Sequence, residues 1–373
     1  MTLCTKLTRR GALFVLLGLT LQAAPSAPAA EAPPLKASEF ARLVGRLSEE
    51  GGYFWNDNYV SNEASYMHPL GRLEELGIRG GIYVGVGPDQ NFTYIASLRP
   101  RYSFIVDIRR QNLLEHFLFR ALFHLARDRR DYLSLLLSRP VRGDLAKRGS
   151  YGVEELVAFF RPAEPDTALF DRTQRRVREF LTRATRLRFS DRDFATIEKV
   201  HRAFFQRGLS IKYDYVPVPT FGELLLERDL QGRHRNFLNS DANYRHLKRL
   251  HEENRIIPVV GDFAGPHTLR ELGRYLREQG EKVTVFYTSN VEQYLLRSQS
   301  WPAFVRNTME LPLDDCAVFI RSYWGSRLPH PESEPGYRFT QVLQYIRPFL
   351  RNLDPAKQHT YFEVVTTDTI RLR

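Results

Sequence analysis

Hydrophobic and polar positions follow two alternating patterns along this chain. Short apolar runs occur at residues 82–84, 104–106, 256–260, 283–287 and 317–320, and each ends at glycine or a polar residue. Runs of this length, bounded by turn residues, are typical of buried strands. Between most of them apolar residues recur at helical spacing. The alternation predicts an α/β protein with a Rossmann-like, mostly parallel sheet and helices on both faces.

One long interval breaks this alternation. From about residue 111 to 250 the apolar residues keep helical spacing, with amphipathic segments at 166–187 and 191–207. We therefore expect a long helical insertion between the second and third strands. Closer to the C-terminus, the pattern predicts a helix at 341–350 and a final strand at 360–366.

The first 30 residues have the composition of an export signal. Lys6, Arg9 and Arg10 precede an uncharged apolar run at 11–21, and small residues follow as far as Ala30. This pattern predicts a signal peptide at 1–30, which leaves a domain at 31–373 in the periplasm or outside the cell. The Arg9-Arg10 pair resembles a twin-arginine signal, whose pathway exports folded proteins. The alternative is an uncleaved N-terminal membrane anchor. No later run is long and apolar enough to span a bilayer.

Charge adds a weaker indication about partners. The formal net charge is +11, and many arginines lie on the helical segment at 166–187. Such residues usually form a solvated helix face, and peripheral contact with an anionic envelope surface is the alternative. No basic run is interleaved with aromatic residues, a pattern that disfavours a nucleic-acid partner. Motifs for metal ligation are absent, including H-E-x-x-H and paired cysteines.

The candidate chemistry lies where the predicted strands end. Gly85 and Gly87 form a turn after the first strand, Asp107 closes the second, and Asp262 with Phe263 follows the third. In open parallel sheets ligands bind outside the carboxyl ends of the strands. Glycine lets a ligand approach the backbone, and a carboxylate can accept hydrogen bonds from two ribose hydroxyls.

These motifs resemble those of class I S-adenosylmethionine-dependent methyltransferases. The resemblance covers residues 81–110 and 256–323 and implies S-adenosylmethionine as cofactor. Gly85 and Gly87 would then face the methionine moiety, Asp107 would bind ribose, and Asp262 with Phe263 would lie near adenine. The chain departs from the family's G-x-G-x-G pattern, because Asp89 stands where the third glycine is expected.

A dinucleotide-binding enzyme is the weaker alternative for this turn. Its fingerprint G-x-G-x-x-G requires a third glycine where this chain has Gln90. Asp89 would also place a negative charge at the helix N-terminus, where a pyrophosphate would bind. A ligand that carries an ammonium group is compatible with that acid.

Two further segments supply candidate residues. Asn62 and Glu63 lie in an aromatic, Asn-rich loop at 53–68 and could hold the amino-acid end of the cofactor, although Asn62 could equally cap a helix. Asn290 could orient a nucleophile, and Glu292 could assist proton removal. The alternative for this pair is an ordinary helix N-terminus.

Taken together, the sequence predicts an S-adenosylmethionine-dependent methyltransferase-like protein whose acceptor is unknown. Export conflicts with full activity, because this cofactor is made in the cytoplasm. The alternative is a non-catalytic exported protein that binds a ligand or associates with the envelope and has a degenerate Rossmann-like fold.

Overall fold

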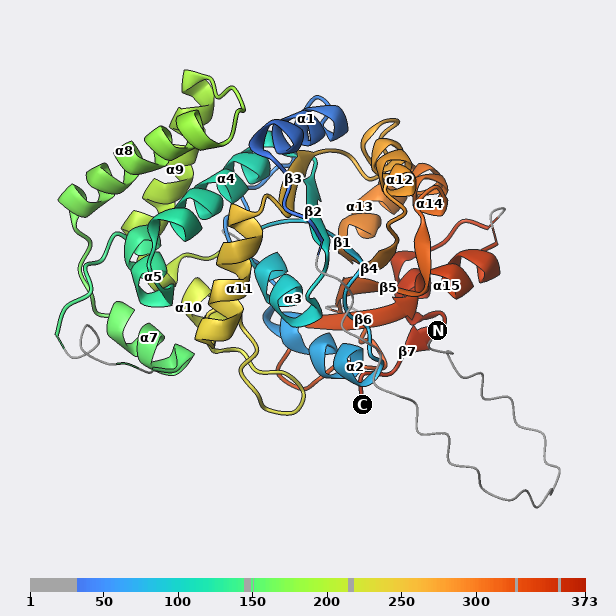
Figure 1. The fold of residues 1–373 in the computed structure, drawn as a ribbon. Helices are drawn as coiled ribbons and strands as arrows, with labels where there is room; N and C mark the ends of the chain where they lie inside the picture. The colour runs from blue at the N-terminus through green and yellow to red at the C-terminus, as the bar shows by residue number, and fades with distance from the viewer. Residues whose placement is uncertain (1–31, 144–148, 150, 214–217, 326–327, 355–356) are drawn as a thin grey trace, which may run out of the picture.

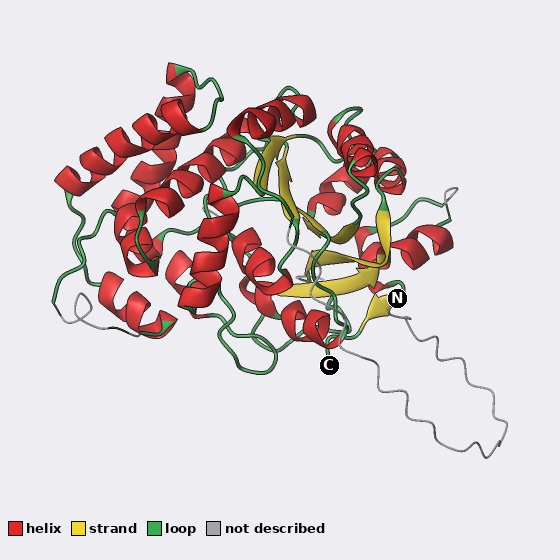
Figure 2. Cartoon of the chain, viewed as in Figure 1, coloured by secondary structure: helices red, strands yellow, loops and turns green. Residues whose placement is uncertain are grey.

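A seven-stranded sheet forms the centre of the protein. The structure, a computed structural model, describes residues 32–143, 149, 151–213, 218–325, 328–354 and 357–373 (Figure 2). The predicted signal peptide at 1–30 lies outside the described residues. The strands are β1 (Ile82–Gly85), β2 (Tyr102–Asp107), β3 (Ile256–Val260), β4 (Val283–Ser289), β5 (Leu313–Trp324), β6 (Phe339–Tyr345) and β7 (Thr369–Ile370).

The order of the strands places the glycine turn at the middle of the sheet. The order is β3-β2-β1-β4-β5-β6-β7, in which β3 to β5 are mutually parallel, while β6 is antiparallel to both β5 and β7. The chain moves outward from β1 to β3 and then returns to the other side of β1. At such a point of reversal the connections diverge and leave a crevice beyond the strand ends. The predicted α/β class and mostly parallel sheet are confirmed.

Helices cover both faces of this sheet. The first group consists of α1 (Ala37–Leu47), α2 (Pro69–Glu75), α3 (Gln90–Leu98), α12 (Thr268–Glu278), α13 (Val291–Arg297), α14 (Trp301–Met309), α15 (Ile346–Asn352) and α16 (Tyr361–Thr366), with a short 3-10 helix η1 (Ala64–Met67). Successive side chains of β4 point to opposite faces. Tyr287 packs against Tyr94 of α3 at 4.9 Å, whereas Phe286 packs between Phe263 and Phe304 of α14. We call these sides the α3 face and the α14 face.

The interval between β2 and β3 is helical in the described residues, apart from one isolated bridge between Lys212 and Thr220. In Figure 1 its outer helices lie on the left, away from the strands. The helices are α4 (Arg110–Leu125), α5 (Arg129–Leu137), α7 (Val153–Phe160), α8 (Thr167–Ala184), α9 (Asp191–Arg207), the 3-10 helix η2 (Gly208–Ser210), α10 (Phe221–Leu226) and α11 (Asp241–Glu252). The ring of Phe92 on α3 contacts Phe119 and Phe123 of α4, which joins this helical part to the α3 face.

Two C-terminal predictions were wrong. Residues 339–345 form β6, and only 346–352 continue as a helix. Gln341 and Gln344 are buried and hydrogen-bonded there, so their polar character gave a false helical periodicity. Residues 361–366 form α16 and not a strand, because Thr360 and Glu363 make a capping box that starts a helix.

The arginines of α8 are exposed, and two of them pair with nearby acids, Arg178 with Asp191 and Arg183 with Glu179. Such pairs are typical of a solvated helix face. Within the described ranges, no helix combines the length and the hydropathy that a bilayer crossing requires.

Candidate functional site

Gly85 and Asp107 lie on the same face and at the same edge of the sheet. Gly85 pairs with Ile105 in the β1–β2 register, two residues before Asp107. Since side chains alternate along a strand, Asp107 points to the same face as Ile105, the α3 face. Phe104 points the other way and contacts Tyr275 of α12. The structure therefore brings the glycine turn and this acid together.

The turn is held by a side chain of the protein itself. The amide nitrogen Nδ2 of Asn91 donates to the carbonyl oxygens of residues 86–88 at 2.9, 3.2 and 2.8 Å. Asn91 Oδ1 accepts from the Tyr83 hydroxyl at 2.7 Å. A Cβ added to Gly85 would lie 2.1 Å from that oxygen, so Gly85 makes room for Asn91. Gly87 has φ +82°, which favours glycine.

Asp107 is already occupied by a cation. Arg109 Nε and Nη2 donate to the two Asp107 carboxylate oxygens at 3.0 and 2.9 Å, and the Arg109 backbone N–H adds a third bond at 2.9 Å. Both side chains are less than a tenth exposed. A bidentate guanidinium uses the same carboxylate edge that two ribose hydroxyls would use.

Two further buried acids, Asp89 and Glu115, stand beside the turn, and neither forms an ion pair with a described residue. Burial raises the pKa of Asp89, at the start of α3, to about 7. Burial also raises the pKa of Glu115 on α4, and the negative charges of Asp89 and Asp107 add to that effect while Arg109 opposes it. Glu115 is fully buried, and its Oε1 has no hydrogen-bond partner. Its Oε2 accepts only a long bond of 3.5 Å from Gln111.

Neighbouring amide and imidazole groups are also incompletely bonded. His116 bonds through Nε2 to the carbonyl oxygen of Gly87 at 2.9 Å, which places this face of α4 against the turn. Its Nδ1, Nδ2 of Asn112 and Oε1 of Gln90 have no partner, and all three residues are buried. Asn112, Glu115 and His116 are three and four residues apart, so they share one side of α4. Orphaned groups are rare inside proteins, so this side of α4 and the turn beside it form a candidate site.

Among the described residues, no group of three or more His, Cys, Asp and Glu side chains is arranged to hold a metal ion.

Glu63 lies in a different environment at the same edge. Its buried carboxylate accepts from the Tyr287 hydroxyl at 2.9 Å, from Gln341 Nε2 at 2.9 Å, and from Ser289 Oγ. Burial nevertheless raises its pKa above the usual value, against the effect of these donors. Gln90 Nε2 donates to the Tyr287 hydroxyl at 3.2 Å. A chain of hydrogen bonds thus connects Glu63 with the first residue of α3, next to the turn.

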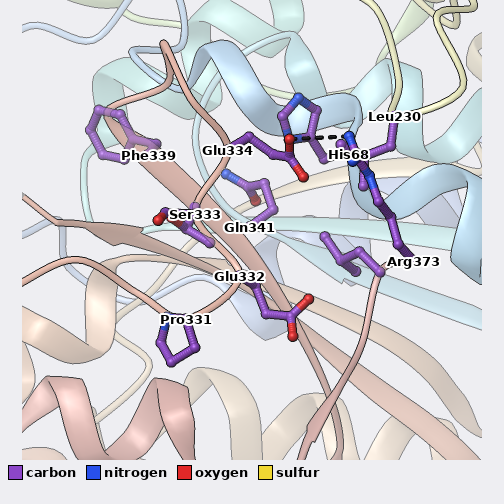
Figure 3. Close-up of a pocket in the computed structure, with 11 residues that line it drawn as sticks. His68, Leu230, Pro331, Glu332, Ser333, Glu334, Phe339, Gln341 and Arg373 are labelled. Carbon is purple, nitrogen blue, oxygen red and sulfur yellow. Dashed lines mark hydrogen bonds and ion pairs between the residues drawn. The ribbon is translucent and has the colours of Figure 1, made fainter.

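The same network reaches a cavity of about 150 Å³ (Figure 3). Gln341 lines this cavity, and its Oε1 is buried without a partner. His68 lines the cavity as well, and burial lowers its pKa to about 4, so it is neutral at pH 7. The dashed line in Figure 3 joins Arg373 to Glu334, whose side chains form an ion pair of 3.1 Å.

Of the other predicted residues in this region, Asn62 is half-buried and directly precedes Glu63. Asn290 occupies the N-cap position of α13, without a side-chain capping bond, and its Oδ1 accepts a 3.4 Å bond from Ser289. Ser289 has φ +53°, an unfavourable conformation for a residue other than glycine. Backbone strain of this kind concentrates at functional sites, and here it directs the Ser289 hydroxyl to Glu63.

Glu292 lies on the opposite side of the sheet. Its carboxylate accepts from Arg321 Nε and Nη2 at 2.5 and 2.9 Å, and from the Thr288 hydroxyl at 3.2 Å. Arg321 is fully buried between the rings of Phe319 and Phe349. Glu292 is therefore one half of an enclosed ion pair, and this arrangement gives it no free edge with which to remove a proton.

Phe263 and Asp262 also have structural contacts. The Phe263 ring lies in the core of the α14 face, 5.0 Å from Phe286, so it does not flank an open site. Asp262 Oδ1 accepts from the backbone N–H of Ala264 at 2.8 Å and thereby closes a turn after β3.

An aromatic segment covers the Asp107 end of the site. The ring of Phe54 lies 5.7 Å from the Arg109 guanidinium and 5.4 Å from the ring of Tyr294. Trp55 packs against Tyr213 and is still 53% exposed. The Asn-rich loop therefore lies over the strand ends.

Comparison with known families identifies relatives without identifying a function. The profile of a family described as a domain of unknown function (DUF7790) matches residues 59–147 and 155–371. The chain belongs to this family. The matched spans include every site residue predicted from the sequence, from Asn62 to Glu292. A search of curated proteins finds no match.

Sequence analysis did not single out several residues of this candidate site: Arg109, Glu115, His116 and Gln341. Arg109 stands two residues beyond Asp107, so the close spacing of opposite charges was a usable indication. Glu115, His116 and Gln341 come from α4 and β6, and nothing local in the sequence links them to the turn or to Glu63.

Proposed function

We propose that this protein binds a cationic, adenosine-bearing small molecule of the S-adenosylmethionine class at the carboxyl edge of its sheet, on the α3 face. The observation that carries the proposal is the pair of buried acids Asp89 and Glu115 beside the Gly85–Gly87 turn, neither of which forms an ion pair with a described residue. We also propose that the sheet has a Rossmann-like arrangement.

Charge favours this ligand over the alternatives. Buried carboxylates raise their pKa because ionisation in a desolvated site is costly, and a neighbouring cation reverses that cost. The sulfonium and ammonium groups of S-adenosylmethionine would supply this cation. A dinucleotide would instead bring a pyrophosphate toward Asp89, which disfavours NAD or FAD.

Ribose would bind at Asp107, and this requires Arg109 to give up its bidentate contact. Arg109 and the aromatic segment over it then act together as a closure that the ligand must open.

Methyl transfer, where it occurs, would depend on alignment of acceptor and sulfonium, which can supply roughly 7–11 kcal/mol of the barrier. Because Glu292 is paired with Arg321, Asn290 is the remaining candidate of the two predicted catalytic residues. That observation favours a second candidate function, a non-catalytic ligand-binding protein with the same site. Export, by the twin-arginine route or another, stays part of this second proposal, because an exported protein would meet little fresh cofactor.

Native mass spectrometry of protein purified without added ligand tests the proposal first, since a bound adenosine-bearing molecule would add its mass. Calorimetry with S-adenosylmethionine and NAD then follows on the wild type and on Asp107→Asn. Asp171→Asn, an exposed change on α8, is the matched control. We expect S-adenosylmethionine to bind, Asp107→Asn to weaken it, and NAD not to bind. Absence of S-adenosylmethionine binding to intact protein would refute the proposal.

A further inference from the structure

A second, larger cavity lies at the opposite edge of the sheet. Its volume is about 300 Å³, and its walls come from α2, the last residues of α3, the loop before β1, residues 234–235, and the first turn of α11. The residues just before β1 and β2 line it, so it opens at the amino ends of these strands. It is therefore separate from the acidic site at the carboxyl ends.

The side chains around this cavity carry an excess of positive charge. Arg235 makes an ion pair with Glu74, through two bonds of 2.6 and 2.5 Å. Arg99 bonds only to a neutral group, Asn243 Oδ1, at 2.8 Å. Arg79 is exposed and forms no ion pair with any described residue. Three guanidinium groups thus line a cavity that holds one carboxylate, Glu74.

The two uncompensated arginines affect each other. Burial lowers the pKa of Arg99, and the positive charges of Arg79 and Arg249 lower it further. Arg99 also has φ +52°, a left-handed conformation at the end of α3. The carbonyl oxygens at that helix end offset part of the positive charge. An anion between Arg79 and Arg99 would relieve the rest of the repulsion.

We infer that this cavity binds the phosphate group of a phosphate monoester. Guanidinium groups match phosphate oxygens in charge and in bidentate geometry. The volume is at the lower end of the range for small-molecule sites, enough for a headgroup-sized molecule. Apolar side chains of Leu70, Leu73 and Ile78 line the same cavity and would contact the carbon part of the ligand. A soluble metabolite and a lipid headgroup share this chemistry.

The test uses the full chain with three probes: glycerol phosphate in solution, vesicles of phosphatidylcholine, and the same vesicles with added phosphatidic acid. Calorimetry at low salt measures glycerol phosphate, and cosedimentation measures the vesicles. The variant is Arg79→Ser with Arg99→Gln, and the control is Arg183→Ala, which removes an exposed arginine on the distant helix α8. Far-UV circular dichroism checks that each variant is folded, and Arg79→Ser alone is measured if the double variant is not.

We expect at least tenfold weaker binding of the phosphate probe in the double variant, and unchanged binding in Arg183→Ala. Binding of glycerol phosphate would identify a soluble ligand, and binding only to vesicles with phosphatidic acid would identify a lipid headgroup. The inference is overturned if neither probe binds, or if Arg183→Ala loses as much affinity as the double variant. None of these results depends on whether S-adenosylmethionine binds at the other edge.

Discussion

Glu115 and Glu292 are both fully buried carboxylates beyond the carboxyl ends of the parallel strands, but their surroundings differ. Glu292, on the α14 face, receives a bidentate guanidinium from Arg321. Glu115, on the α3 face, has one unpartnered oxygen, and its charged neighbours are Arg109, which lowers its pKa, and the acids Asp89 and Asp107, which raise it. The protein itself supplies the counter-charge of Glu292. At Glu115 we expect a ligand to supply it.

This difference separates a structural acid from a functional one. A paired acid holds elements together, here α13 with β5, and its removal exposes an uncompensated charge. An unpaired acid costs stability in the absence of ligand, and a site of this kind persists because binding relieves the cost. The predictions below test whether the two faces differ in this way.

The largest effect is expected on the α14 face. Glu292→Ala leaves Arg321 buried without a counter-charge, so the free energy of unfolding should fall by about 3–5 kcal/mol in urea titrations. Replacing both partners by apolar residues, as Glu292→Leu with Arg321→Met, should recover most of this loss. Equal losses in the single and double variants would show that packing, and not the charge pair, determines stability here.

Replacing Asp89 should stabilise the protein, whereas replacing Glu292 should destabilise it. Its pKa of about 7 in the folded state exceeds the unfolded value of 3.8. The unfolded state therefore releases its proton first as the pH rises from about 4 to about 7, and the protein loses up to about 4 kcal/mol. Asp89→Asn should remove this loss, so it should be more stable than the wild type at about pH 8 and equal to it below about pH 4. A destabilised variant at high pH would mean that Asp89 has a stabilising partner.

Replacing Glu63 should have an effect on stability between those of Glu292 and Asp89. Glu63 is buried and accepts three hydrogen bonds, but it forms no ion pair with a described residue. Glu63→Gln keeps the shape of the side chain but turns an amide N–H₂ toward groups that donate to Glu63 in the wild type. The free energy of unfolding should therefore fall by about 1–3 kcal/mol. Serine and tyrosine hydroxyls can rotate to accept, whereas Gln341 can accept only if its side-chain amide turns over, which removes the Nε2 donor from Ser322 Oγ. Adding Gln341→Glu should therefore recover part of the loss, and no recovery would place the cost elsewhere.

The sequence predicted the parts of this fold that depend on local pattern. The five parallel strands, the helical interval and the shared edge of Gly85 and Asp107 follow from apolar runs and from the place where each run ends. The predicted helix at 341–350 was wrong over its first five residues, because Gln341 and Gln344 are buried through hydrogen bonds that only the folded chain provides.

The ion pairs of the buried acids could not be predicted from the sequence. Glu292 had the position expected of a catalytic base, but Arg321 on β5, 29 residues away in the sequence, pairs with it on the same face of the sheet. Asp107 had the position of a ribose ligand, and Arg109, two residues further along the chain, occupies its carboxylate. Whether a buried acid is paired depends on tertiary contacts, so a position at a strand end identifies a candidate and no more.

The most direct test compares S-adenosylmethionine with S-adenosylhomocysteine by calorimetry, on the wild type and on Glu115→Gln. The two molecules differ by a methyl group and the sulfonium charge. An acidic site predicts at least tenfold tighter binding of S-adenosylmethionine, a difference of about 1.4 kcal/mol, and loss of most of that preference in Glu115→Gln. Equal affinity of the wild type for both molecules, or a preference unchanged in Glu115→Gln, would contradict the account.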